Sequence, residues 1–139
     1  MATPGFTSRW FDRGVDASSL AVAPVVIFDE KDDIQHRYLR SFARAPLSPP
    51  RHFVPVSADF AEAVRLGLGW AMLPDQQSEG PVSRGELVEL PAGHAVDVTL
   101  YWQQWALRMS ALDRVAQVIH DAAERLLSKS SSPTRQQPS

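Results

Sequence analysis

Cysteine is absent from this chain of 139 residues, which excludes disulfide bridges and thiolate metal sites and favours a reducing compartment, the cytoplasm. No apolar run approaches the ~20 residues that cross a bilayer, and the first residues lack the apolar core of a signal peptide. A basic excess is missing too, because 14 lysines and arginines face 16 acidic residues. The net charge of −2 gives no indication of a nucleic-acid-binding surface.

Catalytic and cofactor motifs are also missing. The sequence has no Gly-x-Ser-x-Gly nucleophile elbow and no glycine-rich phosphate-binding loop. Asp32 and His36 share one helix face at a spacing of four residues, but no third ligand is placed beside them by spacing. Such a pair is more often a solvated helix face. We therefore expect a protein that is not an enzyme and that has no cofactor and no metal site.

The patterns that are present predict a soluble α/β protein of one domain's length, with 44% hydrophobic and 22% charged residues. Residues 25–28 form a continuous apolar run, which is typical of a strand buried on both faces. Alternating strands and helices imply parallel pairing with a right-handed crossover. The other predicted strands are 52–56, 70–73, 86–90 and 96–105. Two helices are predicted to begin after the N-caps Thr3 and Asp16. Three more are predicted to begin near Asp32 or Asp33, at Asp59 in a capping box with Glu62, and at Ser110.

The run from the first strand into the next helix carries the most information about function. Four carboxylates and a lysine follow the strand directly, at positions Asp29, Glu30, Lys31, Asp32 and Asp33. Strand ends and helix N-termini are where open α/β folds bind small ligands. A cluster of this composition suits an amino acid with one anionic and one cationic group better than it suits a phosphate.

Five segments together resemble the LysR-type transcriptional regulators: TPGFTSRWF, APVVIFDEKDDIQHRYL, VPVSADFAEAVRLGLGWAMLP, GELVELPAG and TLYWQQW. The FDEKDDIQ and LYWQQW segments are similar, more narrowly, to the branch that senses lysine and arginine and controls the export of basic amino acids. The resemblance covers residues 2–127.

This resemblance implies a fold similar to a type 2 periplasmic binding protein, with two α/β subdomains and an effector between them. Residues 1–97 would be the second subdomain, with a mixed sheet, and residues 98–127 a return strand and C-terminal helix that belong to the first. Residues 128–139 are rich in serine, proline and glutamine and are predicted to be a disordered tail. The winged helix-turn-helix DNA-binding domain of the family has no counterpart in this chain.

The resemblance therefore implies the effector-sensing part of a regulator. Its small-molecule partner would be a basic amino acid, its protein partner a second copy or a full-length homologue, and DNA would be bound only through the domain that this chain lacks. No membrane partner is expected.

Six residues are the candidate ligand contacts: Asp29, Lys31, Asp32, Asp33, Ser57 and Trp102. An acid at the corner would pair with an ammonium or guanidinium group, or else Asp32 and Asp33 only cap the helix. Ser57 would bind a ligand carboxylate or act as a helix cap. Trp102, with its aromatic neighbours, would line the ligand's alkyl chain or belong to a packed core.

A different class of function stays open, in which the chain is a truncated interaction or dimerisation fragment that modulates a full-length regulator or is a remnant of one. Leu112, Val115, Ile119, Ala122 and Leu126 follow the spacing of one buried helix face. That face would normally pack on the missing subdomain. The chain alone is therefore expected to expose apolar surface and to be marginally soluble.

Overall fold

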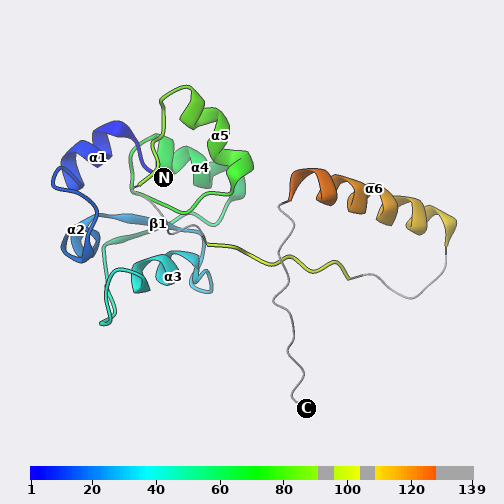
Figure 1. The fold of residues 1–139 in the computed structure, drawn as a ribbon, viewed down its shortest axis with the longest axis horizontal. Helices are drawn as coiled ribbons and strands as arrows, with labels where there is room; N and C mark the ends of the chain where they lie inside the picture. Colours follow the sequence, from blue (N-terminus) through cyan, green and yellow to red (C-terminus); the bar gives the residue numbers. More distant parts are fainter. Residues whose placement is uncertain (91–95, 104–108, 128–139) are drawn as a thin grey trace, which may run out of the picture. The chain divides into compact units, whose positions relative to one another are not determined.

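The computed structural model of the protein describes residues 1–90, 96–103 and 109–127 (Figure 1). The chain divides into two compact units, Met1–Val96 and Asp97–Ser139. This division lies next to the predicted boundary between residues 97 and 98, although the assignment of the units to two subdomains stays a prediction. The predicted tail, residues 128–139, lies outside the described residues.

The first unit begins with two short helices whose caps are those predicted. Helix α1 (Pro4–Trp10) starts with proline at its first position, and the Phe6 amide donates to the Thr3 hydroxyl at 3.1 Å. Helix α2 (Ala17–Val22) is held by a reciprocal capping box, in which the Ser19 amide donates to Asp16 and the Asp16 amide donates to Ser19. Local side-chain chemistry therefore determines both starts.

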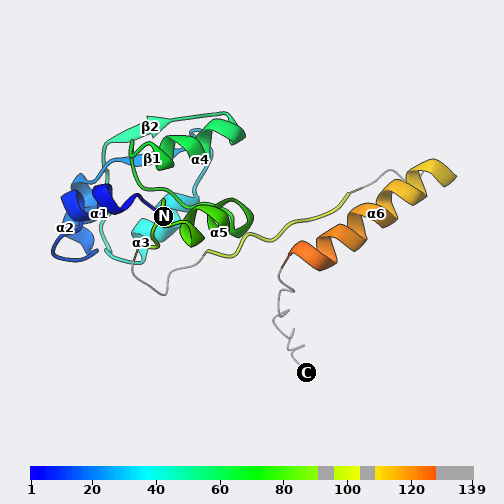
Figure 2. The same ribbon diagram turned by 90° about the horizontal axis from the view of Figure 1, so that it is seen from above.

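Two parallel strands with a helix between them form the centre of this unit (Figure 2). Strand β1 (Val25–Ile27) pairs with β2 (Arg51–Phe53) in the register Val26 to His52. Helix α3 (Ile34–Arg40) lies between them in sequence. The parallel β–α–β unit confirms the α/β class. All of β1 is buried whereas all of β2 is exposed, as expected for an edge strand that ends before Pro55.

Two further helices follow, α4 (Ser57–Arg65) and α5 (Asp75–Ser83). The predicted capping box at Asp59 is wrong. Helix α4 begins two residues earlier, with Val56 at the N-cap position, so Asp59 lies in the first turn. There its carboxylate still opposes the positive end of the helix dipole. The helix ends where predicted, since Gly67 adopts a φ of 78°.

Side chains from both faces of β1 form the core. Val25 and Ile27 pack in one cluster with Tyr38 and Leu39 of α3, and Val26 packs in a second cluster with residues of α4. Alternate side chains of a strand point to opposite faces, so β1 lies between the two helices. Trp70, fully buried, packs against Tyr38 with ring centroids 5.3 Å apart.

The shorter predicted strands are only partly formed. In 70–73, Trp70 makes a single parallel bridge to Val25, and in 86–90, Val88 makes a single antiparallel bridge to Ala2. The sheet of β1 and β2 is parallel and the antiparallel bridge lies outside these strands, so the mixed sheet stays a prediction. The strand predicted over 96–105 is wrong for residues 96–103, which are irregular; its last two residues lie outside the described part. A strand needs a neighbour to pair with, and within the described residues this segment pairs with no other strand.

Helix α6 (Ser110–Leu126) is the long element of the second unit, and it begins at the predicted residue. Its apolar stripe is largely exposed, with Leu112 at 47%, Val115 at 55% and Leu126 at 64%. The apolar surface expected for the chain alone is therefore present. No helix within the described residues is long and apolar enough to cross a membrane.

Candidate functional site

The candidate site is the loop of residues 28–33, which joins the buried strand β1 to helix α3. Asp29 organises its first half. Its Oδ1 accepts two backbone hydrogen bonds, from the Lys31 amide at 2.8 Å and from the Asp32 amide at 3.0 Å. An aspartate that bonds to amides two and three residues ahead fixes a tight turn. The turn therefore fixes the backbone of the loop on which the other acidic residues lie.

Asp32 organises the second half of the loop. Its Oδ1 accepts from the Ile34 amide at 3.1 Å, and its Oδ2 from the Phe28 amide at 3.4 Å. With its amide nitrogen facing the carboxylate, Gln35 donates to Oδ2 at 3.1 Å and to Oδ1 at 3.2 Å. Gln35 is 1% exposed, so this bond ties Asp32 to the core. Asp32 therefore anchors the loop and satisfies the first free amide of α3.

Asp33 is the acid that stays available. It occupies the N-cap position of α3, but its side chain makes no capping bond. Its Oδ1 lies 3.7 Å from Arg37 Nε, and its side chain is 67% exposed. An exposed pair at this distance contributes little, about 0–1 kcal/mol. Glu30 and Lys31 are exposed as well. The corner thus presents Glu30 and Asp33 outward, above a loop that Asp29 and Asp32 hold in place.

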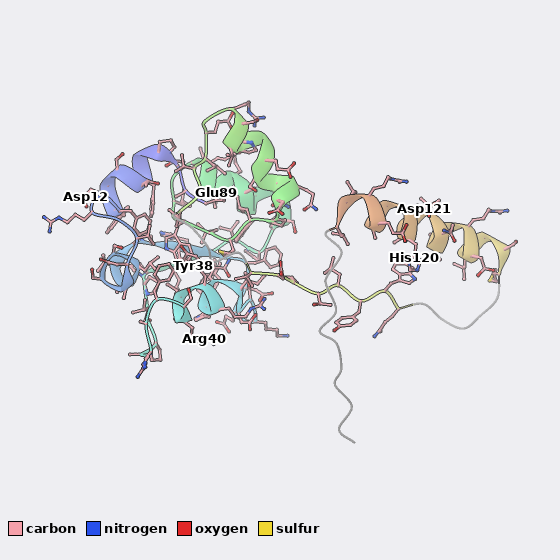
Figure 3. The ribbon with its side chains drawn as sticks, viewed as in Figure 1. Asp12, Tyr38, Arg40, Glu89, His120 and Asp121 are labelled. Atoms are coloured by element: carbon pink, nitrogen blue, oxygen red, sulfur yellow. The ribbon has the colours of Figure 1, made fainter. Side chains whose placement is uncertain are left out.

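The two remaining candidates lie away from this loop in the sequence. Ser57 is the first residue of α4 and is exposed. The interpretation of Ser57 as a helix cap is wrong, because Val56 holds that position and no side chain caps the helix. Trp102 belongs to the second unit and is 48% exposed. Its ring lies edge-on to that of His120, with centroids 6.4 Å apart. His120 is a residue of α6 (Figure 3).

A cavity that sequence reasoning missed lies beside α5. Its volume is about 430 Å³, and its lining includes the carboxylates of Asp75, Glu79 and Glu89 together with Met1. Burial lowers the pKa of the Met1 amino group to about 6, against an opposing effect of the nearby Glu89 carboxylate. The Met1 ammonium group donates to the Ala71 carbonyl at 2.9 Å. The spacing of Asp75 and Glu79, one helical turn apart, was the available signal.

Metal binding finds no support among the described residues. No group of three or more histidine, aspartate or glutamate side chains in this part of the chain is placed to hold an ion. The Asp32 carboxylate is instead engaged by Gln35 and by backbone amides. An amide-bound carboxylate of this kind fits a structural role better than a ligand role.

Comparison with known proteins identifies the relatives of the chain. No family model matches it. The HTH-type transcriptional regulator ArgP of Pseudomonas aeruginosa is 41% identical over 105 residues, which are 76% of this chain and 35% of that protein. The crystal structure of ArgP from Mycobacterium tuberculosis superposes with a TM-score of 0.84 at 34% identity, covering 90% of this chain and 43% of that one.

Two further solved structures complete the comparison. The C-terminal domains of a LysR family protein from Agrobacterium tumefaciens match with a TM-score of 0.75 at 33% identity, covering 91% of this chain and 60% of that one. The full-length LysR-type regulator LysG of Corynebacterium glutamicum, with the effector arginine bound, gives 0.78 at 33% identity, covering 89% and 42%. The chain is homologous to the C-terminal domains of LysR-type transcriptional regulators.

This homology confirms the resemblance given by the sequence segments. The relatives are transcriptional regulators of the LysR type rather than enzymes. The chain spans about a third of the length of the curated ArgP protein it matches. The matched part of the LysR-type proteins includes their C-terminal domains, in keeping with the α/β fold observed for the first unit.

Proposed function

We propose that the chain is the effector-sensing part of a LysR-type regulator and that its effector is a basic amino acid, arginine or lysine. The observation that carries this proposal is the 33% identity and TM-score of 0.78 to LysG, which was solved with arginine bound. In this proposal the fold is one subdomain of a type 2 periplasmic-binding-protein-like domain. Effector binding would shift the population of regulator conformations rather than drive any chemistry.

The geometry of the corner supports a basic ligand. Asp33 and Glu30 are exposed carboxylates on a loop whose shape is fixed by Asp29 and Asp32, so little ordering is needed when a cation binds. A guanidinium or ammonium group would pair with Asp33, displacing its long contact to Arg37. Lys31 and Ser57 would bind the carboxylate of the effector.

Calorimetric titration with L-arginine and L-lysine tests this function. We expect weak binding, with a Kd on the order of 1 mM, because the contacts come from few charge-assisted hydrogen bonds of about 1.5–3 kcal/mol each. Citrulline keeps the shape of arginine but not its charge, so it should bind at least about tenfold more weakly. Equal heats for citrulline and arginine would contradict recognition of the positive group.

A matched pair of substitutions locates the binding group. Asp33→Asn removes a charge that makes no capping bond and should weaken arginine binding about tenfold without unfolding the protein. Asp59→Asn removes another exposed acid, from the first turn of α4, and should leave the Kd unchanged. The same loss in both variants would show that only overall charge matters.

One observation favours the second candidate function, an interaction or dimerisation fragment. The apolar stripe of α6 is exposed over most of its length, which is typical of a surface that packs on another polypeptide. Co-purification with a full-length homologue, together with silence in the arginine titration, would favour this candidate over the sensor. Binding of arginine without co-purification would favour the sensor.

A further inference from the structure

Charge is distributed very unevenly along the first unit, although the whole chain carries only −2. Between Ile34 and Ala58 the sequence holds four arginines and two histidines and no acidic residue at all. The arginines are Arg37, Arg40, Arg44 and Arg51. Acidic residues gather on either side, at the 28–33 loop and from Asp59 onward. We call residues 34–58 the basic segment.

The basic segment is one continuous stretch of the first unit. It comprises α3, the proline-containing connection after it, and the edge strand β2. Strand β2 is exposed along its whole length, and Arg40 projects from the last turn of α3 (Figure 3). Pro46, Pro49 and Pro50 restrict the connection, which limits the entropy lost when a partner orders it.

Three of these arginines are exposed and are not neutralised. No ion pair within the described residues involves Arg40, Arg44 or Arg51. Elsewhere in the same unit, by contrast, Arg65 and Arg84 both pair with Glu86, at 2.9 Å and 2.8 Å. Exposed guanidinium groups that make no ion pair within the described residues are free to meet a polyanion.

We propose that the basic segment binds the phosphate backbone of duplex DNA, without reading its sequence. This inference rests on the proposed function, because relatives of the chain are HTH-type transcriptional regulators and so act on DNA. Guanidinium groups form bidentate hydrogen bonds with phosphate oxygens. Charge favours DNA over an acidic protein, since a duplex presents one negative charge per ~1.7 Å of its axis.

Contacts of this kind are weak on their own and become important when another domain already holds the protein on DNA. Each phosphate contact releases condensed counterions, so affinity falls steeply as salt rises. Within a tethered regulator, the local DNA concentration is in the millimolar range, at which weak backbone contacts become occupied. The basic segment would then help to orient the sensing domain on the duplex.

Fluorescence anisotropy of a labelled duplex of about 20 base pairs, titrated with the full chain at low salt, tests the proposal. We expect binding whose logarithmic salt dependence has a slope of about −3, one unit for each of the three exposed arginines. Arg40→Ala/Arg44→Ala should weaken binding about tenfold and reduce the slope by about 2. Arg13→Ala/Arg125→Ala removes the same charge from exposed positions outside the segment and should change affinity less than about twofold.

Three results would overturn the proposal: no binding at low salt, an equal loss in both double variants, or equally tight binding of a labelled polyglutamate peptide. The last would identify the surface as one for acidic proteins. Arginine titrations on the same variants keep this question separate from the sensor function. If the sensor proposal fails and DNA binding stands, arginine heats vanish in every variant while the anisotropy difference persists.

Discussion

Among the glycines of the described residues, Gly69 has the least room for a side chain. A Cβ there would lie 2.7 Å from the Pro24 carbonyl oxygen and 3.2 Å from Val26 Cγ2. The neighbouring Trp70 amide donates to the same carbonyl at 3.1 Å, so the two backbones cannot separate without losing that bond. Gly69 therefore lets the segment after α4 pass close beside β1.

The substitution Gly69→Ala should lower the free energy of unfolding by about 1–3 kcal/mol, the usual cost of overpacking a core. Urea denaturation followed by tryptophan fluorescence measures this. Gly5→Ala is the matched control, because Gly5 lies inside α1 with open space around its Cα, and the change should be neutral or stabilising by up to about 1 kcal/mol. Equal midpoints for the two variants would show that the close approach is unimportant.

The acids of the 28–33 loop show how far sequence reasoning extends at the residue scale. The order of residues predicts that four acids lie between β1 and α3, and the structure has them on the loop that joins these elements. That order does not predict that Asp29 and Asp32 accept hydrogen bonds from the loop's own amides while Asp33 points outward. That division depends on the turn geometry of six residues, and neighbouring aspartates are equivalent by type. The sequence therefore indicates which acids lie at the corner, but not which of them is free to bind a ligand.

At the scale of elements, the sequence patterns that predicted helices and strands correctly were those contained within one short segment. The caps Thr3 and Asp16, the apolar run of β1 and the periodicity of α6 each predicted an element that the structure contains. Strands 70–73, 86–90 and 96–105 were predicted from the sequence pattern alone, but pairing depends on a partner strand elsewhere in the chain. Helix α4 began early because Ser57 and Ala58 continue the helix without a cap.

Helix α6 supports a prediction at this scale. Its exposed stripe should bind an environment-sensitive dye and promote self-association of the chain. Val115→Ser should lower the affinity for the dye and the self-association constant about fivefold each, because about 1 kcal/mol of apolar contact is removed from each helix. Arg114→Ser, on the polar face of the same helix, should change neither. Sedimentation velocity and dye titration measure the effects, and identical behaviour of the two variants would argue against an apolar interface on α6.

At the scale of the whole molecule, the first unit combines two oppositely charged regions on either side of the start of α3. The acidic 28–33 loop is proposed to bind the cationic effector, and the basic segment that follows it is proposed to bind DNA phosphate. The net charge of −2 is a sum over both regions, so it does not show that basic and acidic residues are separated along the chain. For this reason the net charge gave no indication of a nucleic-acid-binding surface. Charge order along the chain carries information that charge totals do not.

Resonance mapping of the arginine site tests the central claim most directly. In a titration of the isotopically labelled chain with L-arginine, we expect the backbone amides of residues 28–34 and of Ser57 to shift together, in fast exchange for a Kd on the order of 1 mM. Amides of α1 should not move. Shifts confined to the acid-lined cavity near Met1 and Asp75, or no shifts at millimolar arginine, would contradict the assignment of the effector site to the corner between β1 and α3.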